Sequence, residues 1–297
     1  MSWRRLGWID IPTARPRWWV SHAGFPTVVS VHGDEVLLFV SSRDEVQRSS
    51  CAHLRIGLLE NGVEVIETGR EPLLTPGAAG CFDESGVNVT FAEEDSGVMT
   101  VWYHGWLLLR GGGWINSIGR ASGTLEDGLR RGSEAPVFDR DSEDPTSIGY
   151  PYWFNFPSGR ALFYCSYESY GVPSLGQPYS YRVKLASGPN LSRRGFVLPH
   201  FPGAQAQSRP SVVSYMGRYL MFLSVKGDKY SICCAESPDG ESWSWSERDW
   251  FLPPAGSEGE VEETAYASVI THRGKLVMFY NGDGHGATGV GVAVWDD

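Results

Sequence analysis

A segment of similar pattern occurs five times along the chain, at a spacing of about 60 residues. Each copy begins with a turn glycine, continues as an apolar strand that carries an aromatic residue, and ends in polar residues. Self-similarity at this period is typical of propeller-like repeats, in which one small sheet recurs along the chain. The copies begin at Gly33, Gly97, Gly159, Gly217 and Gly274.

Each copy has a further apolar strand on either side, and helical periodicity is not sustained anywhere. The fifth copy stops after its third strand, whereas the earlier copies have room for a fourth. The N-terminal segment WRRLGWIDI alternates like a strand and is suited to supply the missing one, which removes an exposed sheet edge. The sequence therefore predicts an all-β fold: one domain over residues 1–297, a five-bladed β-propeller whose ring is closed by the N-terminal strand. A stack of β-sandwiches fits the same pattern.

The charge of the chain excludes several classes of partner. A net charge of -10 and a pI near 5.2, without a basic cluster, predict no nucleic-acid and no membrane partner. No secretory signal or membrane-spanning run is present, and the five cysteines form no C-x-x-C pair, so we expect a cytoplasmic protein with reduced thiols. Neither a metal-ligand cluster nor a nucleotide-binding fingerprint occurs, so no cofactor and no metal are expected. These exclusions leave a small molecule as the expected class of ligand.

Ionisable residues precede the first strand of the copies, where a propeller opens on one face of its axis. A carboxylate in this position favours a role in ligand binding or catalysis. Asp144, which precedes a proline, also fits a turn, and Arg209 also fits a structural link to neighbouring carboxylates. The residues at these positions are His22, Asp83, Asp144, Arg209, Glu262 and Glu263.

The loops between the second and third strands are expected on the same face. The last of them, NGDGHGATG, combines polar side chains with glycines that allow a close approach of the backbone to a ligand. In the first copy the equivalent loop offers Arg43 and Asp44, which also fit a local ion pair in a turn. Trp106 and Trp114 lie in or beside such a loop and are candidates to stack on a sugar ring. The polar candidates of the last loop are Asn281, Asp283 and His285.

The whole chain resembles the five-bladed β-propeller glycosidase-like proteins related to glycoside hydrolase families 43 and 32, in particular a bacterial branch found near polysaccharide or specialised-metabolite genes. The resemblance rests on SHAGFP, SSRDEVQRS, GCFDESGV, NSIGRASG, PVFDR, SRPSVV, AESPDGESW and YNGDGHGATGVGVAV. It implies a small-molecule sugar or polyol-like substrate. It also implies metal-independent chemistry by carboxylates at the starts of the axial strands.

By this resemblance, Asp83 is the expected base and Glu262 the expected proton donor, with His22 as an additional acid or base. Arg43, Asp44, Arg209 and Asn281 are expected to hold ring hydroxyls. The set of three carboxylates is incomplete, because His22 stands where the hydrolases typically have aspartate and the fourth copy has Gln205 and Gln207.

Three functions therefore stay open: a glycosidase, a biosynthetic cyclase, lyase or isomerase on the same fold, and a carbohydrate-binding propeller without catalysis.

Overall fold

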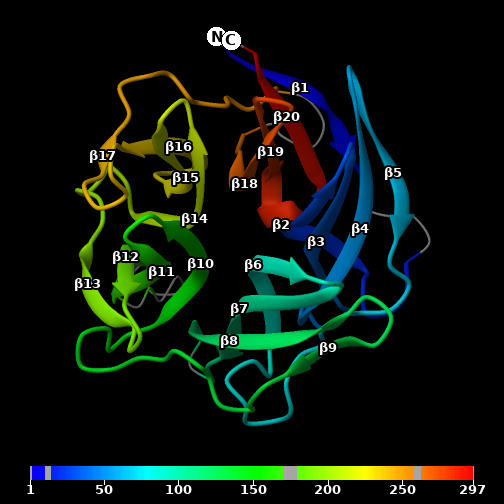
Figure 1. The fold of residues 1–297 in the computed structure, drawn as a ribbon. Coiled ribbons are helices and arrows are strands. Elements are labelled where there is room, and N and C mark those ends of the chain that lie inside the picture. The colour runs from blue at the N-terminus through cyan, green and yellow to red at the C-terminus, as the bar shows by residue number, and fades with distance from the viewer. Residues whose placement is uncertain are drawn as a thin grey trace.

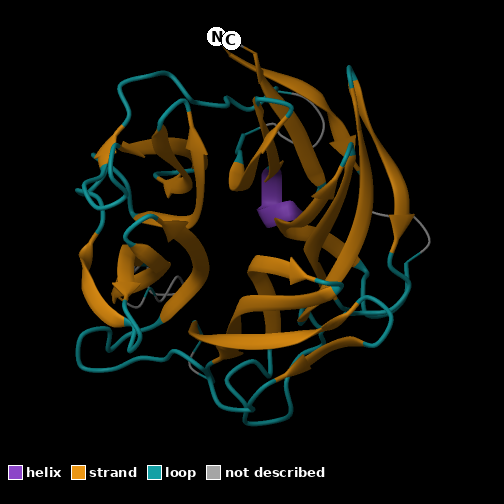
Figure 2. Cartoon of the chain, viewed as in Figure 1, coloured by secondary structure: helices purple, strands orange, loops and turns teal. Residues whose placement is uncertain are grey.

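The computed structural model describes residues 2–10, 15–110, 112–169, 171, 179–256 and 262–296. Nearly all of its regular structure is β (Figure 2). Within these ranges the helical structure is one short turn, α1 (Asp283–Gly286), which lies at the inner end of the last strands. The prediction of an all-β chain is confirmed. No helix in the described part of the chain is long and apolar enough to cross a membrane.

The strands form one sheet of four strands and two sheets of eight, and the antiparallel pairs within them group the strands into five units of four. In each eight-stranded sheet a single parallel bridge joins two successive units. The first four units each follow the chain order, and the fifth takes its outer strand from the N-terminus. Unit 1 contains β2 (Ser21–His32), β3 (Glu35–Arg43), β4 (Ser49–Leu59) and β5 (Gly62–Thr68). Unit 2 contains β6 (Gly86–Asp95), β7 (Val98–Leu108), β8 (Trp114–Thr124) and β9 (Gly128–Arg131). Unit 3 contains β10 (Ile148–Phe156), β11 (Gly159–Ser169), β12 (Ser180–Ser187) and β13 (Ser192–Phe196). Unit 4 contains β14 (Ala206–Tyr215), β15 (Arg218–Lys226), β16 (Tyr230–Ser237) and β17 (Ser244–Trp245), and unit 5 contains β18 (Ala265–His272), β19 (Lys275–Asn281), β20 (Val290–Asp296) and β1 (Ser2–Ile9).

The repeated glycines make the tight turns between the first and second strands of the units. Gly33 and Gly217 have φ of 63° and 73°, a left-handed conformation that glycine adopts without a steric penalty. Each turn reverses the chain within two residues, so that β2 pairs with β3 and β14 with β15. In these units the glycine therefore sets the position of the inner hairpin, whereas in unit 3 the turn is Pro157-Ser158 and Gly159 begins β11.

The apolar side chains form cores between successive units. One cluster joins units 1 and 2, and others join units 2 and 3, units 3 and 4, and units 4 and 5. A further cluster joins the fifth unit to the first and contains Val36 and Leu38 of unit 1 and Val277 and Phe279 of unit 5. Figure 1 shows the units set around a common centre, with the two termini side by side. This packing of each unit on the next favours a ring over separate sandwiches.

The N-terminal strand completes unit 5, as expected. β1 pairs with β20 in antiparallel register from Ser2 with Asp296 to Ile9 with Val290. The Trp3 side chain is buried, and its Nε1 donates a hydrogen bond to the carbonyl of Trp250 at 2.9 Å. Ile9 is also buried, so β1 contributes core contacts as well as ladder hydrogen bonds.

The first strand of every unit carries a β-bulge near its start. The register of each strand with its neighbour shifts there, between Gly149 and Tyr152 in unit 3, for example. In four units the bulged residue is not glycine and has positive φ. Backbone strain of this kind persists only where the surrounding structure enforces it, and a bulge re-aims side chains. These residues are Phe25, Tyr150, Arg209 and Tyr266.

Candidate functional site

A cavity of about 710 Å³ lies where the first strands of the five units meet. Its size falls within the range of roughly 300–1,000 Å³ that is typical of small-molecule sites. Nine of the twenty described residues that line it are aromatic, and the others are mostly polar. The lining residues are His22, Phe25, Arg43, Gln47, Asn88, His104, Trp106, Leu108, Trp114, Asn116, Tyr150, Tyr167, Tyr179, Tyr181, Gln205, Ala206, Lys226, Tyr230, Tyr266 and His285.

The bulges bring three aromatic rings together in this cavity. The ring of Phe25 lies 4.4 Å from that of Tyr266 and 5.9 Å from that of Tyr150, measured between centroids. His104 contacts the same cluster, at 4.5 Å from the Tyr150 ring. The hydroxyls of Tyr181 and Tyr230 lie 2.7 Å apart and hydrogen-bond to each other. The cavity therefore presents flat apolar surfaces beside hydroxyl groups, which suits a ligand that has apolar faces and polar edges.

Several polar atoms at this cavity have no protein partner among the described residues. They are Asn88 Oδ1, Asn116 Oδ1, His104 Nδ1 and the hydroxyl of Tyr179. Asn88 Nδ2 lies 2.9 Å from His104 Nε2, and Asn116 Nδ2 donates to the Tyr167 hydroxyl at 3.0 Å. A buried polar atom without a partner is costly, so these atoms are suited to bind a ligand or water.

Five of the residues singled out from the sequence line the cavity: His22, Arg43, Trp106, Trp114 and His285. The Arg43 guanidinium lies 4.9 Å from the Trp106 ring centroid, and Trp106 Nε1 donates to Ser49 Oγ at 2.9 Å. His285 Nδ1 lies 3.0 Å from the Tyr266 hydroxyl. Gln205, at the start of the fourth unit, also lines the cavity.

The expectation that Asp83 and Glu262 face this cavity is wrong. Asp83 is buried inside unit 2, where it accepts hydrogen bonds from Arg131 Nε at 2.7 Å and the Tyr103 hydroxyl at 3.1 Å. Glu262 is exposed and pairs with Lys229. Neither residue lines the cavity.

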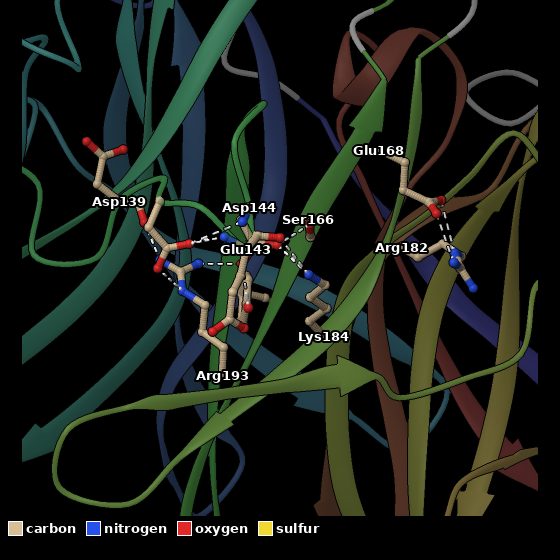
Figure 3. A network of polar contacts seen from close by, with 10 residues as sticks. Asp139, Glu143, Asp144, Ser166, Glu168, Arg182, Lys184 and Arg193 are labelled. Carbon is tan, nitrogen blue, oxygen red and sulfur yellow. Dashed lines mark hydrogen bonds and ion pairs between the residues drawn. The ribbon is translucent and has the colours of Figure 1, made fainter.

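Asp144 repeats the arrangement of Asp83 in the next unit. Its carboxylate accepts hydrogen bonds from Tyr164, Ser166, Lys184 and Arg193, all within unit 3 (Figure 3). Burial tends to raise the pKa of this carboxyl, but these four donors outweigh it and hold the pKa below its usual value. Asp144 is thus a structural residue of its unit.

The other predicted residues also have structural partners. Asp44 accepts hydrogen bonds from the backbone of Val46 and Arg48 and pairs with the Arg48 side chain, the local turn that its sequence also fits. Arg209 is buried and donates to the carbonyl of Pro26 and to Thr27 Oγ1, where the sequence suggested carboxylate partners.

The last loop is held in the same way. Asn281 links unit 5 to unit 1, since Oδ1 accepts from the Phe25 backbone and Nδ2 donates to the Ala23 carbonyl. Asp283 accepts from the backbone N–H groups of Glu262 and Glu263, and Glu263 in turn accepts from the Tyr230 backbone.

Sequence reasoning missed the cavity residues that lie within strands. His104, Asn88, Asn116, Lys226 and the lining tyrosines other than Tyr179 lie on strands and give no local motif. The doublets Phe25-Pro26, Tyr150-Pro151 and Arg209-Pro210 mark three of the four bulged residues with positive φ and are the signal that was available.

The histidines of the cavity are neutral near neutral pH. Burial first, and then the nearby Arg43 and His285 side chains, lower the pKa of His22 to about 4. Burial, Arg43 and Arg209 lower the pKa of His104 to about 3. Both side chains are therefore able to accept a hydrogen bond or a proton at neutral pH.

These shifts predict that the free energy of unfolding falls as the pH is lowered from 6.5 towards 4. In the unfolded chain both histidines bind a proton near 6.5, whereas in the folded protein they do so only near 4 and 3. The unfolded state therefore gains protons first, and acid stabilises it. Urea unfolding at pH 7, 6 and 5 measures the effect. His22→Gln should flatten the pH dependence, and His32→Gln, at an exposed position, should leave it unchanged. Equal slopes in all three proteins would contradict the assignment.

Among the residues that the structure describes, no group of three His, Cys, Asp or Glu side chains is placed to hold a metal ion.

The search for a matching family model found none. The chain is similar over its whole length to two proteins of Mycobacterium tuberculosis, Uncharacterized protein MT1551 of strain CDC 1551 / Oshkosh and Uncharacterized protein Rv1502 of strain ATCC 25618 / H37Rv. Each is 32% identical over 300 residues and is covered completely.

Solved structures of low sequence identity share the fold. A structure described as a glycoside hydrolase has a TM-score of 0.71 and 15% identity, with 99% of this protein and 91% of that one covered. A glycosyl hydrolase from Bacteroides ovatus has a TM-score of 0.63 and 11% identity, with 99% and 94% covered. The GH43_1 enzyme from Xanthomonas citri, complexed with xylose, has a TM-score of 0.61 and 14% identity, with 97% and 89% covered. The chain thus has the fold of the propeller glycoside hydrolases and belongs to the same family as the two mycobacterial proteins.

Proposed function

We propose that the five units are the blades of a closed five-bladed propeller, and that the protein is an enzyme that binds a sugar or sugar-like polyol ring in the cavity at its centre. The observation that carries this proposal is the lining of the cavity, where nine aromatic residues stand beside histidines and amides. Aromatic faces bind the apolar faces of sugar rings, and polar groups at the edges fix their orientation. The fold shared with glycoside hydrolases supports the same substrate class.

The reaction proposed is proton transfer by histidine and tyrosine, of the elimination or isomerisation kind. His22 lines the cavity and is neutral at neutral pH, as a general base must be. The tyrosine hydroxyls stay protonated, because burial raises the pKa of Tyr266 and Tyr181 well above its ordinary value. His22 would take a proton from a ring carbon, and a tyrosine would return one to the leaving oxygen or to a neighbouring carbon. The product is then dehydrated or isomeric.

Hydrolysis by a carboxylate pair is the second candidate, and the fold is what favours it. An inverting glycosidase needs an acid and a base on opposite sides of the ring, about 6.5–9.5 Å apart. Among the described lining residues there is no aspartate or glutamate, and Asp83 and Glu262 both have partners elsewhere. The shared fold therefore supports Asp83 as the base and Glu262 as the proton donor, but the lining of the cavity does not.

Product mass distinguishes the reactions. Purified protein is incubated with neutral and acidic aryl glycosides and with intermediates from its own gene neighbourhood. The proposal expects a product of equal mass or one lighter by one water, and gain of water would instead establish hydrolysis. Saturable binding without turnover would identify a carbohydrate-binding propeller and contradict the proposed reaction.

Variants test the base. His22→Gln should lower turnover by about a hundredfold to ten-thousandfold, because it removes the proton acceptor. His32→Gln, outside the cavity, should have normal turnover. Full activity of folded His22→Gln would reject His22 as the base, whichever product forms.

A further inference from the structure

The charged side chains that line the cavity have one sign. Arg43 and Lys226 are cations, and no described aspartate or glutamate is among the lining residues. The chain as a whole is acidic, with 35 Asp and Glu against 25 Lys and Arg. The cavity is therefore a positively charged site in a negatively charged protein.

Arg43 has no carboxylate partner in the described part of the chain. Its Nη1 donates to the carbonyl of Gln47 at 2.9 Å, and its guanidinium lies over the Trp106 ring. The neighbouring Asp44 already accepts from Arg48 Nε at 2.9 Å and from the backbone of Val46 and Arg48. Arg43 therefore lies at the cavity with N–H donors left over for a ligand.

Lys226 is the second cation. Its ammonium lies 5.3 Å from the Tyr230 ring centroid, and it forms no ion pair with a described residue. Lys229, three residues further on, differs in being paired with Glu262. Lys226, which has no carboxylate partner among the described residues, lines the cavity, and the paired Lys229 does not.

The field of Arg43 extends across the cavity. Burial is the main cause of the lowered pKa of His22, on the same unit, and of His104, on the next unit, and the charge of Arg43 lowers both further. Partly buried charges in proteins are usually paired, and an unpaired guanidinium beside a cavity of ligand size lacks its counter-charge.

We propose that the ring bound in the cavity carries an anionic group, a carboxylate or a phosphate, and that Arg43, with Lys226 as second cation, binds that group. This inference rests on the proposed function, since the anion is placed on the sugar-like ring. A guanidinium offers paired donors that fit either oxyanion. The unpartnered amide oxygens of Asn88 and Asn116 then serve as acceptors for ring hydroxyls.

Calorimetric titration with four probes tests the inference: glucose, glucuronate, glucose 6-phosphate and inorganic phosphate. The native protein should bind at least one acidic sugar about tenfold or more tightly than glucose. Arg43→Gln should remove this preference, and Arg43→Lys should keep part of it. Arg160→Gln is the matched control, because the Arg160 guanidinium also lies over a tryptophan, 4.7 Å from the Trp153 centroid, but outside this cavity. Circular dichroism verifies that each variant is folded.

The probes separate failure of the inference from failure of the proposed function. If glucose and the acidic sugars bind with equal affinity, and Arg43→Gln does not change these affinities, the anion site is overturned and the sugar site stands. Binding of inorganic phosphate that is lost in Arg43→Gln, with no binding of any sugar, would uphold the anion site and overturn the proposed function. Absence of Arg43-dependent binding by both acidic sugars and by phosphate would overturn the inference. Arg43-dependent binding of glucuronate but not of glucose 6-phosphate would identify the anionic group as a carboxylate, and the converse result would identify it as a phosphate.

Discussion

Asp144→Asn is expected to lower the free energy of unfolding by about 3–5 kcal/mol, the usual cost of breaking a buried ion pair by removing one partner. The substitution keeps the size of the side chain but leaves Lys184 and Arg193 without their buried carboxylate (Figure 3). The Arg193 side chain is 8% exposed, so water does not replace the lost partner. Urea unfolding followed by circular dichroism measures the change.

Glu168→Gln is the matched control for this prediction. Glu168 forms a similar pair with Arg182 in the same unit, but its side chain is 33% exposed. Exposed pairs contribute about 0–1 kcal/mol, so we expect a loss within that range. Equal losses in the two variants would show that the Asp144 network is not a special source of stability. A large loss of activity in folded Asp144→Asn would point instead to the ligand-binding role that the sequence suggested.

Removal of residues 1–10 is expected to abolish cooperative unfolding near room temperature. The truncated protein loses the whole pairing of β1 with β20 and the burial of Trp3 and Ile9. Hydrogen bonds of about 1 kcal/mol each and burial of two large side chains together exceed about 5 kcal/mol, which is comparable with the total stability of many domains. Differential scanning calorimetry of the truncated and full-length proteins measures this loss.

A second measurement makes this test specific to strand pairing. A synthetic peptide of residues 1–10, added to the truncated protein, should restore a cooperative transition. Arg4→Ala removes the exposed pair with Asp296 and an exposed hydrogen bond to Asn61 Oδ1 at 3.4 Å, and should cost less than about 1 kcal/mol. Thermal unfolding of the truncated protein at the native temperature would contradict the view that β1 closes the ring.

The fold was predictable because its determinants are local and repeated. Gly33 and Gly217 adopt the left-handed backbone conformation that a tight turn requires, and the alternation of apolar residues between such turns predicts the strands. The missing fourth strand of unit 5 also followed from the sequence, since an unpaired edge requires a partner and the N-terminal segment has strand alternation.

The site was less predictable, because the direction of a side chain near the start of a strand depends on the bulges. A shift of one residue moves a side chain to the other face, and every first strand contains such a shift. Asp83 precedes its strand in a tight turn, in which its carbonyl accepts from the backbone of Gly77 and Gly86, and its carboxylate points into the unit towards Arg131. Of the residues singled out from the sequence, those that line the cavity are His22, Arg43, Trp106, Trp114 and His285.

The pairing of Trp3 with Trp295 has a consequence for synthesis on the ribosome. β1 cannot pair until β20, which lies at the other end of this sequence, has been synthesised, and until then both strands present unpaired edges. Contacts of such long sequence separation slow folding and prolong the exposure of aggregation-prone surface. The first four units can form in order during synthesis, but the fifth can form only once β20 has emerged, so the interval before that pairing is when the nascent protein most needs a chaperone.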